Sequence, residues 1–268
     1  VLMACGSTGS LKVGQDIHAE VKEQNLLGKD MALGTTLLHM YAKCGVLNKA
    51  HEVFELLPQR DVVSWNALMD GHAQMGQVKT VFKLLNEIRL KRILPDPITF
   101  LIVLNACSHS GEMCKAQTLY DNMTKRFGVA PKLKHHTSMV LVFGCAGHFD
   151  KVISVIEMMP SFYDCSLWLA LLCACKKWGN VKLGRLAFDQ TVQLDNTCAA
   201  IYVLMASIYI AAGLQEDAQK VEAMRNKLAL CKNLGNSTWV DSNGNIYPFS
   251  TGDIILYQTQ DMHIQEYN

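Results

Sequence analysis

Glycines recur along this chain at intervals of 36, 31, 35, 36, 32 and 34 residues. Each glycine follows one stretch with apolar residues at helical spacing and precedes another. These glycines are Gly9, Gly45, Gly76, Gly111, Gly147, Gly179 and Gly213. A period of this size is typical of stacked supersecondary units and not of one globular enzyme domain. We therefore predict an all-α fold, an α-solenoid of stacked helix-turn-helix repeats.

The stretch 62–96 shows how one unit is built. Trp65 and Leu68 begin an apolar stripe at helical spacing, which ends at Gly76, where a left-handed residue can terminate a helix. A second stripe follows and stops before Pro95, because proline cannot extend a helix. Five residues after each turn glycine comes a small or β-branched residue, which lets two antiparallel helices approach closely: Gly14, Ala50, Val81, Ala116, Val152, Gly184 and Ala218.

The composition excludes several classes of protein. The chain has 25 basic and 24 acidic residues, so no bulk positive field attracts nucleic acid or a membrane surface. No apolar run is long enough for a membrane span. The ten cysteines include no CxxC pair and lie mostly in apolar helical stretches, which favours free buried thiols in a reducing compartment. We expect no metal and no cofactor.

The two ends of the chain differ from the middle. Residues 1–5 have the composition of the middle of a helix, so we expect the chain to be a fragment of a longer protein. The segment 237–247 is typical of two short strands around the Asn243-Gly244 turn, and it predicts a β-hairpin-like tail.

The sequence resembles the plant pentatricopeptide repeat family, in particular its PLS subfamily with E-type C-terminal motifs and a truncated start of a DYW domain. Residues 36–45 (TLLHMYAKCG) resemble the short repeat of that subfamily, and 62–69 (VVSWNALM) resemble the start of its standard repeat. Residues 99–111, from Thr-Phe to Ala-Cys-Ser-His-Ser-Gly, resemble its long repeat. The alternating intervals match the order long, short, standard, long, short.

The resemblance divides the chain into repeats. It implies a partial long repeat at 1–30, a short repeat at 31–61, a standard repeat at 62–96, a long repeat at 97–132 and a short repeat at 133–164. Two E-type motifs, similar to tetratricopeptide repeats, follow at 165–232, and 233–268 resembles the beginning of a DYW-type segment.

In this family each repeat binds one nucleotide of single-stranded RNA, and the fifth and last residues of the repeat contact the base. The resemblance implies the base-reading pairs Thr35 with Asp61, Asn66 with Asp96, Leu101 with Lys132, and Thr137 with Asp164. The second residues would flank the base: Ala32, Val63, Ile98 and Lys134. The family pattern implies guanine for Thr with Asp and uracil for Asn with Asp, while Leu101 cannot form a side-chain hydrogen bond.

Structural roles compete with these assignments. Asp61 and Asp96 are also expected helix N-caps, and Thr35 and Asn66 can be exposed helix residues. His18-Ala19-Glu20 matches the HxE of zinc deaminases but has no CxxC near it, so we interpret it as structural. His135 and His136 point about 100° apart on a helix, which favours a structural or RNA-facing role over a metal site.

We predict a site-recognition factor for C-to-U RNA editing that binds single-stranded RNA in a mitochondrion or chloroplast and is itself not an enzyme. A DYW-type deaminase or other editing factors are expected partners through the E-type motifs, and no membrane is involved. Two alternatives remain open: a fragment of a DYW-type deaminase without its catalytic part, and a tetratricopeptide-like protein-binding scaffold.

Overall fold

The computed structural model describes residues 1–27, 29–159, 165–231, 237–240 and 246–249. Almost all of these residues lie in α-helices, which confirms the predicted all-α repeat class. The helices are α1 (Leu2–Thr8), α2 (Leu11–Glu23), α3 (Met31–Lys43), α4 (Leu47–Leu56), α5 (Val62–Gln74), α6 (Val78–Leu90), α7 (Pro97–Ser110), α8 (Met113–Phe127), α9 (Leu133–Cys145), α10 (Phe149–Glu157), α11 (Cys165–Trp178), α12 (Val181–Leu194), α13 (Ala199–Ala211) and α14 (Gln215–Cys231).

The turn glycines separate the two helices of each pair. All seven adopt the left-handed conformation, with φ between 65° and 80°. A residue with a side chain adopts this conformation only with strain, whereas glycine adopts it freely. The glycine rhythm of the sequence therefore marks helix-turn-helix hairpins, as predicted.

The small residues that follow the glycines allow the helices to pack closely. A Cβ atom added at Gly14 would lie 2.5 Å from the side chain of Met40, and one added at Gly184 would lie 3.1 Å from Ile208. Ala50 and Ala116 occupy the same place in their hairpins and are fully buried. The requirement for limited bulk at this point, predicted from the sequence, is confirmed.

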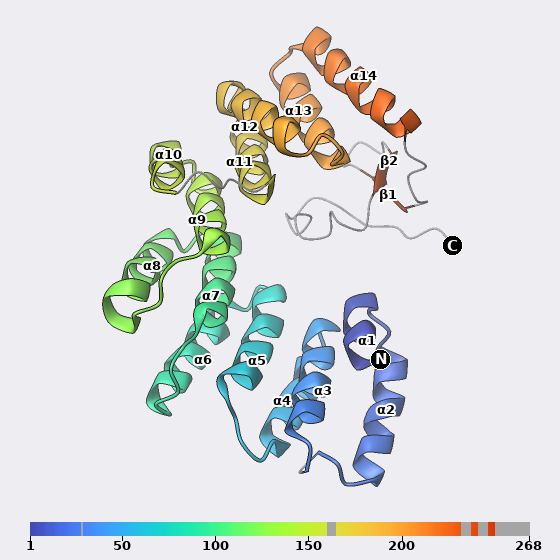
Figure 1. The fold of residues 1–268 in the computed structure, drawn as a ribbon, viewed down its shortest axis with the longest axis vertical. Coiled ribbons are helices and arrows are strands. Elements are labelled where there is room, and N and C mark those ends of the chain that lie inside the picture. Colours follow the sequence, from blue (N-terminus) through green and yellow to red (C-terminus); the bar gives the residue numbers. More distant parts are fainter. Residues whose placement is uncertain (28, 160–164, 232–236, 241–245, 250–268) are drawn as a thin grey trace. The chain divides into compact units, whose positions relative to one another are not determined.

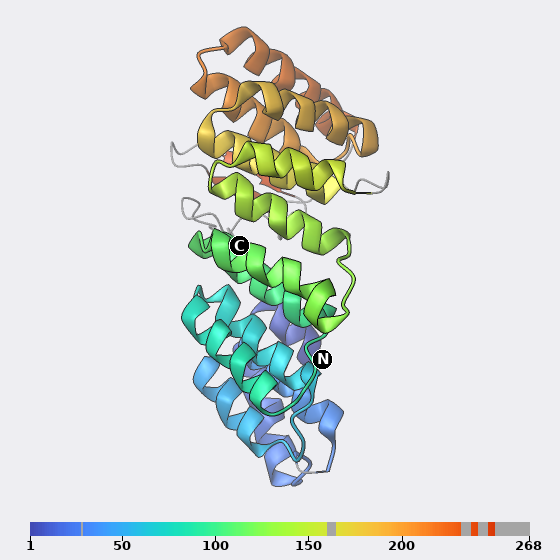
Figure 2. The ribbon, with the colours of Figure 1, turned by 90° about the vertical axis from the view of Figure 1, so that its left-hand side faces the viewer.

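The chain forms two compact units, Val1–Ser138 and Met139–Asn268, and α9 spans the division. In the first unit the first helices of successive hairpins contact one another directly, in the order α1, α3, α5 and α7 (Figure 1). The second helices α2, α4 and α6 each pack on the first helix of their own hairpin and on that of the next one, and α8 packs on α7. Figure 2 shows the same antiparallel pairs from the side. One hairpin alone leaves an apolar face exposed, and stacking buries it.

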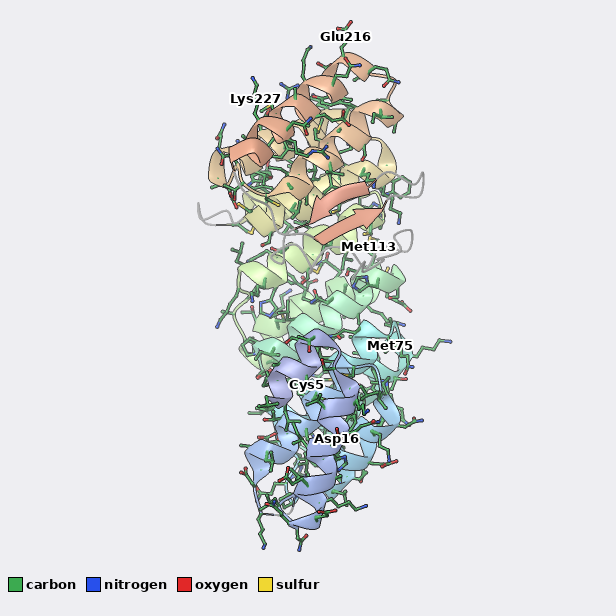
Figure 3. The ribbon with its side chains drawn as sticks, turned by 90° about the vertical axis from the view of Figure 1, so that its right-hand side faces the viewer. Cys5, Asp16, Met75, Met113, Glu216 and Lys227 are labelled. Carbon is green, nitrogen blue, oxygen red and sulfur yellow. The ribbon has the colours of Figure 1, made fainter. Side chains whose placement is uncertain are left out.

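Each helix of the first unit separates a buried face from an exposed one. Cys5 on α1 is buried, whereas Asp16 on α2 is exposed, and Figure 3 views both helices from the solvent side. An ion pair joins two neighbouring first helices, with Lys43 Nζ on α3 lying 2.8 Å from Asp70 Oδ2 on α5. Polar contacts therefore supplement the apolar packing between successive hairpins.

The second unit continues with the hairpins α11–α12 and α13–α14, which pack on each other through α11, α12 and α13. Gly144 on α9 lies against α11, because an added Cβ would be 2.5 Å from that of Ala174. The tail holds two strands, β1 (Ser237–Val240) and β2 (Ile246–Phe249), which pair antiparallel with Trp239 opposite Tyr247. The predicted Asn243-Gly244 turn lies outside the described residues. None of the described helices is long and apolar enough to cross a membrane.

Candidate nucleic-acid interface

The base-flanking residues and the first member of each base-reading pair lie in the first two turns of four first helices. Each base-flanking residue stands three positions before its base-reading residue, so the two share one helix face. These pairs are Ala32 and Thr35 on α3, Val63 and Asn66 on α5, Ile98 and Leu101 on α7, and Lys134 and Thr137 on α9. All four flanking residues are exposed, and the apolar Val63 and Ile98 are 55% and 57% exposed. An apolar base face can therefore reach both side chains.

Asp61 and Asp96, each predicted as the last residue of a repeat, are the N-caps of α5 and α7. Asp61 Oδ1 accepts a hydrogen bond from the backbone N–H of Ser64 at 2.9 Å, at the start of α5. Asp96 Oδ1 accepts one from the backbone N–H of Thr99 at 2.8 Å, at the start of α7. The predicted capping role is confirmed for both residues, and it holds each carboxylate at the edge of the row of first helices.

Asn66 and Asp96, predicted as one base-reading pair, are in direct contact although they are thirty residues apart. Asn66 Nδ2 donates to Asp96 Oδ1 at 2.9 Å, and Asn66 Oδ1 accepts from the Thr99 hydroxyl at 2.7 Å. Asn66 is only 5% exposed, so its interpretation as a freely exposed helix residue is wrong. The amide is held because both of its ends have partners.

The chemistry of these groups determines the orientation of the amide. A carboxylate oxygen only accepts hydrogen bonds, so the NH₂ end of Asn66 must face Asp96. The Thr99 hydroxyl accepts from the backbone N–H of Asp96 at 3.1 Å, and its one proton faces two acceptors, Asn66 Oδ1 at 2.7 Å and Asp96 Oδ1 at 2.9 Å. One amide hydrogen, one lone pair of Oδ1 and Asp96 Oδ2 then remain for a ligand.

The preceding pair, Thr35 with Asp61, is an open pair, by which we mean that no side-chain hydrogen bond joins its two members among the described residues. Thr35 is half-buried, and its hydroxyl has no hydrogen-bond partner among the described residues. Ser64 occupies the same helix position as Thr99, but its hydroxyl donates to the backbone oxygen of Asp61 at 2.8 Å. The structure therefore does not link this pair through side chains.

The two remaining pairs differ again. Leu101 is half-buried and Lys132 is exposed, and the backbone N–H of Lys132 donates to Nδ1 of His135 at 2.9 Å. The Thr137 hydroxyl donates to the backbone oxygen of Leu133 at 3.1 Å. Its predicted partner Asp164 lies outside the described residues.

The histidines singled out in the sequence have protein partners. His18 Nδ1 lies 2.8 Å from the Tyr41 hydroxyl, and Glu20 is exposed. His135 Nε2 donates to the backbone oxygen of Pro97 at 2.8 Å, whereas His136 Nδ1 lies 2.8 Å from the hydroxyl of Tyr120. The two rings thus face different neighbours, in agreement with a structural role for the pair. The part of the chain that the structure describes holds no group of three potential metal ligands.

Cys5, Cys107 and Cys175 are buried free thiols. Burial raises the pKa of Cys107 and of Cys175 to about 12. Both thiols therefore stay protonated at neutral pH and behave as small apolar side chains and not as nucleophiles.

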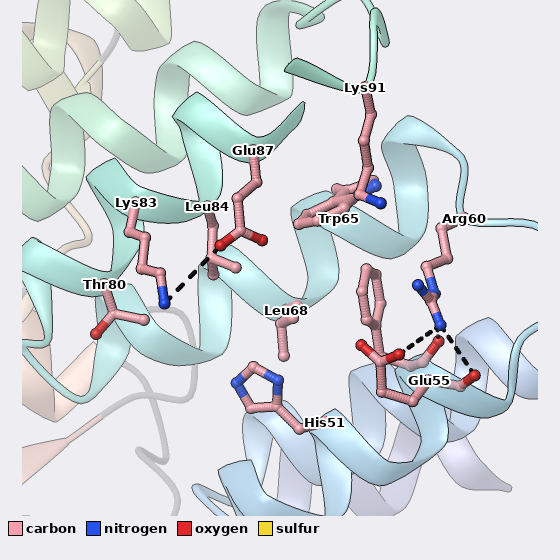
Figure 4. Close-up of a pocket in the computed structure, with 11 residues that line it drawn as sticks. His51, Glu55, Arg60, Trp65, Leu68, Thr80, Lys83, Leu84, Glu87 and Lys91 are labelled. Carbon is pink, nitrogen blue, oxygen red and sulfur yellow. Dashed lines mark hydrogen bonds and ion pairs between the residues drawn. The ribbon is translucent and has the colours of Figure 1, made fainter. Parts of the chain in front are cut away.

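A separate cavity of about 330 Å³ lies between α4, α5 and α6 (Figure 4). Its charged groups are partly neutralised within the chain, since Arg60 pairs with Glu55 at 2.5 Å and Lys83 lies 3.9 Å from Glu87. Burial and the neighbouring His72 lower the pKa of His51, which also lines it. None of the predicted base-reading residues lines this cavity, so it is distinct from the candidate interface.

Thr99 is the residue of this interface that the sequence reasoning missed. It is fully buried and contacts both members of the Asn66–Asp96 pair. A signal was present, because Asp96 and Thr99 have the three-residue spacing of a capping box, and such a spacing turns the third side chain back toward the N-cap. The contact to Asn66, from the preceding repeat, has no signature in the sequence.

Comparisons with known proteins agree with the repeat architecture. A model described as "PPR repeat family" matches residues 60–109, and one described as "PPR repeat" matches 35–62 and 135–163. A chloroplastic pentatricopeptide repeat-containing protein of Arabidopsis thaliana is 32% identical over 98% of this chain and 35% of its own length. A mitochondrial one from the same plant is 36% identical over 94% of this chain and 37% of its own length. The chain thus spans about a third of the length of these relatives, whose names support the predicted organelle localisation.

Solved structures show the same fold. The crystal structure of the pentatricopeptide repeat protein PPR10 from maize has a TM-score of 0.64 and 23% identity, covering 87% of this chain and 34% of that one. A tetratricopeptide repeat protein from Parabacteroides merdae has a TM-score of 0.57 and 14% identity, covering 85% of this chain and 95% of that one. The matched repeat models, the relatives and the hairpin geometry together show that the chain is built from repeats of the pentatricopeptide type, as its plant relatives are.

Proposed function

We propose that this chain binds single-stranded RNA in a plant organelle and serves as a site-recognition factor for C-to-U editing. The hydrogen bond between Asn66 and Asp96 carries the proposal, because it joins two residues that the family resemblance pairs for contact with one base. Single-stranded bases expose their pairing edges, and a side chain held on a rigid helix can bond them. The nearly balanced charge of the chain makes local contacts of this kind, and not a bulk field, the source of affinity.

The similar fold of PPR10 supports an RNA ligand, since that protein has also been crystallised with an 18-nucleotide RNA element. We propose that the unit 31–61 prefers guanine through Thr35 and Asp61, and that 62–96 prefers uracil through Asn66 and Asp96. The apolar Leu101 gives 97–132 little discrimination. Thr137 and Asp164 are proposed to read the base at 133–164.

Two side chains at each reading position are proposed to hold the faces of the base. Val63 and Ile98 are more than half exposed on successive first helices, where a base can pack on them. Ala32 offers a smaller surface, and Lys134 brings a charge that suits a phosphate. Through these contacts the base edge is presented to the reading pair.

We further propose that the E-type motifs at 165–232 dock an editing partner such as a DYW-type deaminase. The surface of these hairpins includes the half-exposed apolar residues Trp178, Leu186 and Ile210, which a partner can cover. In this proposal the chain acts by binding, and the deamination is performed elsewhere.

A binding titration tests the RNA proposal. Fluorescence anisotropy measures the affinity of the 268-residue chain for single-stranded RNA with guanine followed by uracil in an adenine background. Replacing the uracil by another base is expected to weaken binding by about 1–3 kcal/mol, by analogy with base-edge contacts in DNA. The substitution Asn66→Thr should move the preference at that position from uracil toward guanine. An unchanged preference contradicts the proposed reading pair.

A further inference from the structure

The orientation of the Asn66 amide decides which pyrimidine it fits. Uracil presents the acceptor O4 beside the donor N3–H, whereas cytosine presents the donor N4–H beside the acceptor N3. The two edges carry opposite orders of donor and acceptor. An amide that can rotate by half a turn about its last side-chain bond therefore fits both bases, and an amide held in one orientation fits one of them.

Thr99 lies at the oxygen end of this amide. Its side chain is fully buried, and its hydroxyl accepts from the backbone N–H of Asp96 at 3.1 Å. The hydroxyl proton faces Asn66 Oδ1 at 2.7 Å, the nearer acceptor, and Asp96 Oδ1 at 2.9 Å. Asp96 Oδ1 holds the nitrogen end at 2.9 Å. If the amide turned over, its oxygen would face the carboxylate of Asp96, where no proton lies between them, and the contact would be repulsive.

We propose that Thr99 is a positioning residue that fixes the Asn66 amide, so that the unit 62–96 discriminates uracil from cytosine. The inference rests on the proposed reading of a base by Asn66 and Asp96. It adds a third residue to the pair, and that residue stands at the third helical position of α7, in the following repeat. Asp96 bonds the nitrogen of the Asn66 amide and Thr99 bonds its oxygen. Removing either contact therefore leaves the amide with one of its two hydrogen bonds.

The preceding repeat contains a natural control. Ser64 stands at the third helical position of α5 and is also fully buried. Its hydroxyl donates to the backbone oxygen of Asp61 and does not reach Thr35. The third helical residue therefore bonds the base-reading side chain of the preceding repeat at Thr99, but not at Ser64.

The test measures the ratio of the dissociation constants for RNA with cytosine and with uracil at the position of 62–96. We compare the 268-residue wild type with Thr99→Val, which removes the hydroxyl and keeps the shape, and with Thr99→Ser, which keeps the hydroxyl. Thr99→Val is expected to lower the preference for uracil by about fivefold, the effect of one neutral hydrogen bond. Thr99→Ser is expected to retain it. Ser64→Ala should leave the ratio unchanged.

The outcomes separate the two proposals. A wild type without a preference for uracil at this position overturns the base reading itself. A wild type with the preference, which Asn66→Ala abolishes and Thr99→Val retains in full, overturns the role of Thr99 alone.

A second measurement does not depend on the folding of Thr99→Val. In the ¹⁵N-labelled wild type, NMR follows the two side-chain amide protons of Asn66. The proton bound to Asp96 should exchange with solvent more slowly than the other one. Equal and fast exchange of both protons contradicts a fixed amide.

Discussion

Two neighbouring repeats of this chain present the same kind of residues in different states. In 62–96 the Asn66 amide bonds both Asp96 and Thr99 and is almost completely buried. In 31–61 Thr35 is half-buried, its hydroxyl has no hydrogen-bond partner in the part of the chain that the structure describes, and Asp61 caps α5. The pairing of the fifth and last residues of a repeat thus gives a preorganised pair in 62–96 and an open pair in 31–61. The first fixes its geometry before a ligand arrives, which reduces the ordering cost of binding.

Removing the two reading side chains should give the largest contrast. Asn66→Ala loses two hydrogen bonds, so the free energy of unfolding is expected to fall by about 1–2 kcal/mol and the uracil preference to vanish. Thr35→Ala removes a hydroxyl that bonds none of the described residues and should change stability by less than about 0.5 kcal/mol, while abolishing the guanine preference. Urea unfolding and RNA anisotropy measure the two effects. Equal destabilisation by the two variants contradicts the difference between the pairs.

The two capping carboxylates should differ by a smaller amount. Asp61→Ala removes one cap contact and is expected to cost about 1 kcal/mol. Asp96→Ala also leaves the buried Asn66 amide without its acceptor, which adds about 1 kcal/mol. Urea unfolding of both variants gives the comparison, with Asp30→Ala as a third cap of the same kind at α3. If Asp96→Ala costs no more than the other two, its bond to Asn66 does not stabilise the fold.

The open pair can be converted into the closed one. The double variant Thr35→Asn with Ser64→Thr rebuilds the residue set of Asn66, Asp96 and Thr99 around Asp61. We expect the base preferred by 31–61 to change from guanine to uracil. The ratio of the dissociation constants for RNA with cytosine and with uracil at that position should be about fivefold higher than for Thr35→Asn alone. Anisotropy with the four bases at that position tests this. Identical ratios in the single and double variants would show that Ser64 and threonine are equivalent there.

Acid should weaken the repeat with the open pair by a small amount. Burial lowers the pKa of His39 and of His51, both in 31–61, with smaller contributions from Lys43 and His72 respectively. The unfolded chain therefore binds protons first as the pH falls through the ordinary histidine value of about 6.5, and the stability present above that pH declines. The urea midpoint should be lower at pH 5.5 than at pH 7.5.

The variant His39→Gln with His51→Gln should reduce this pH dependence, whereas replacing the exposed His148 by Gln serves as the control. If the urea midpoint changes with pH equally in the double variant and in His148→Gln, groups other than His39 and His51 cause the loss of stability in acid.

The sequence was sufficient for the hairpins but not for the state of each pair. Gly45 and Gly76 predicted their turns because only glycine adopts that backbone conformation without strain, and Asp61 and Asp96 predicted their caps because capping is local. The burial of Asn66 and its bond to Thr99 were not predictable. They depend on how α5 and α7 approach one another, and this distance results from the packing of the whole hairpin and not from any residue pattern.

The location of Thr99 has a consequence for the reuse of these repeats as parts. Asn66 belongs to one repeat, while the hydroxyl that orients it belongs to the next. A designer who exchanges 97–132 for a foreign repeat would then also alter the nucleotide choice of 62–96, although no residue of that repeat has changed. The natural cassette for transfer would be a repeat together with the first helical turn of its successor, so recombination at repeat borders is not neutral for the target.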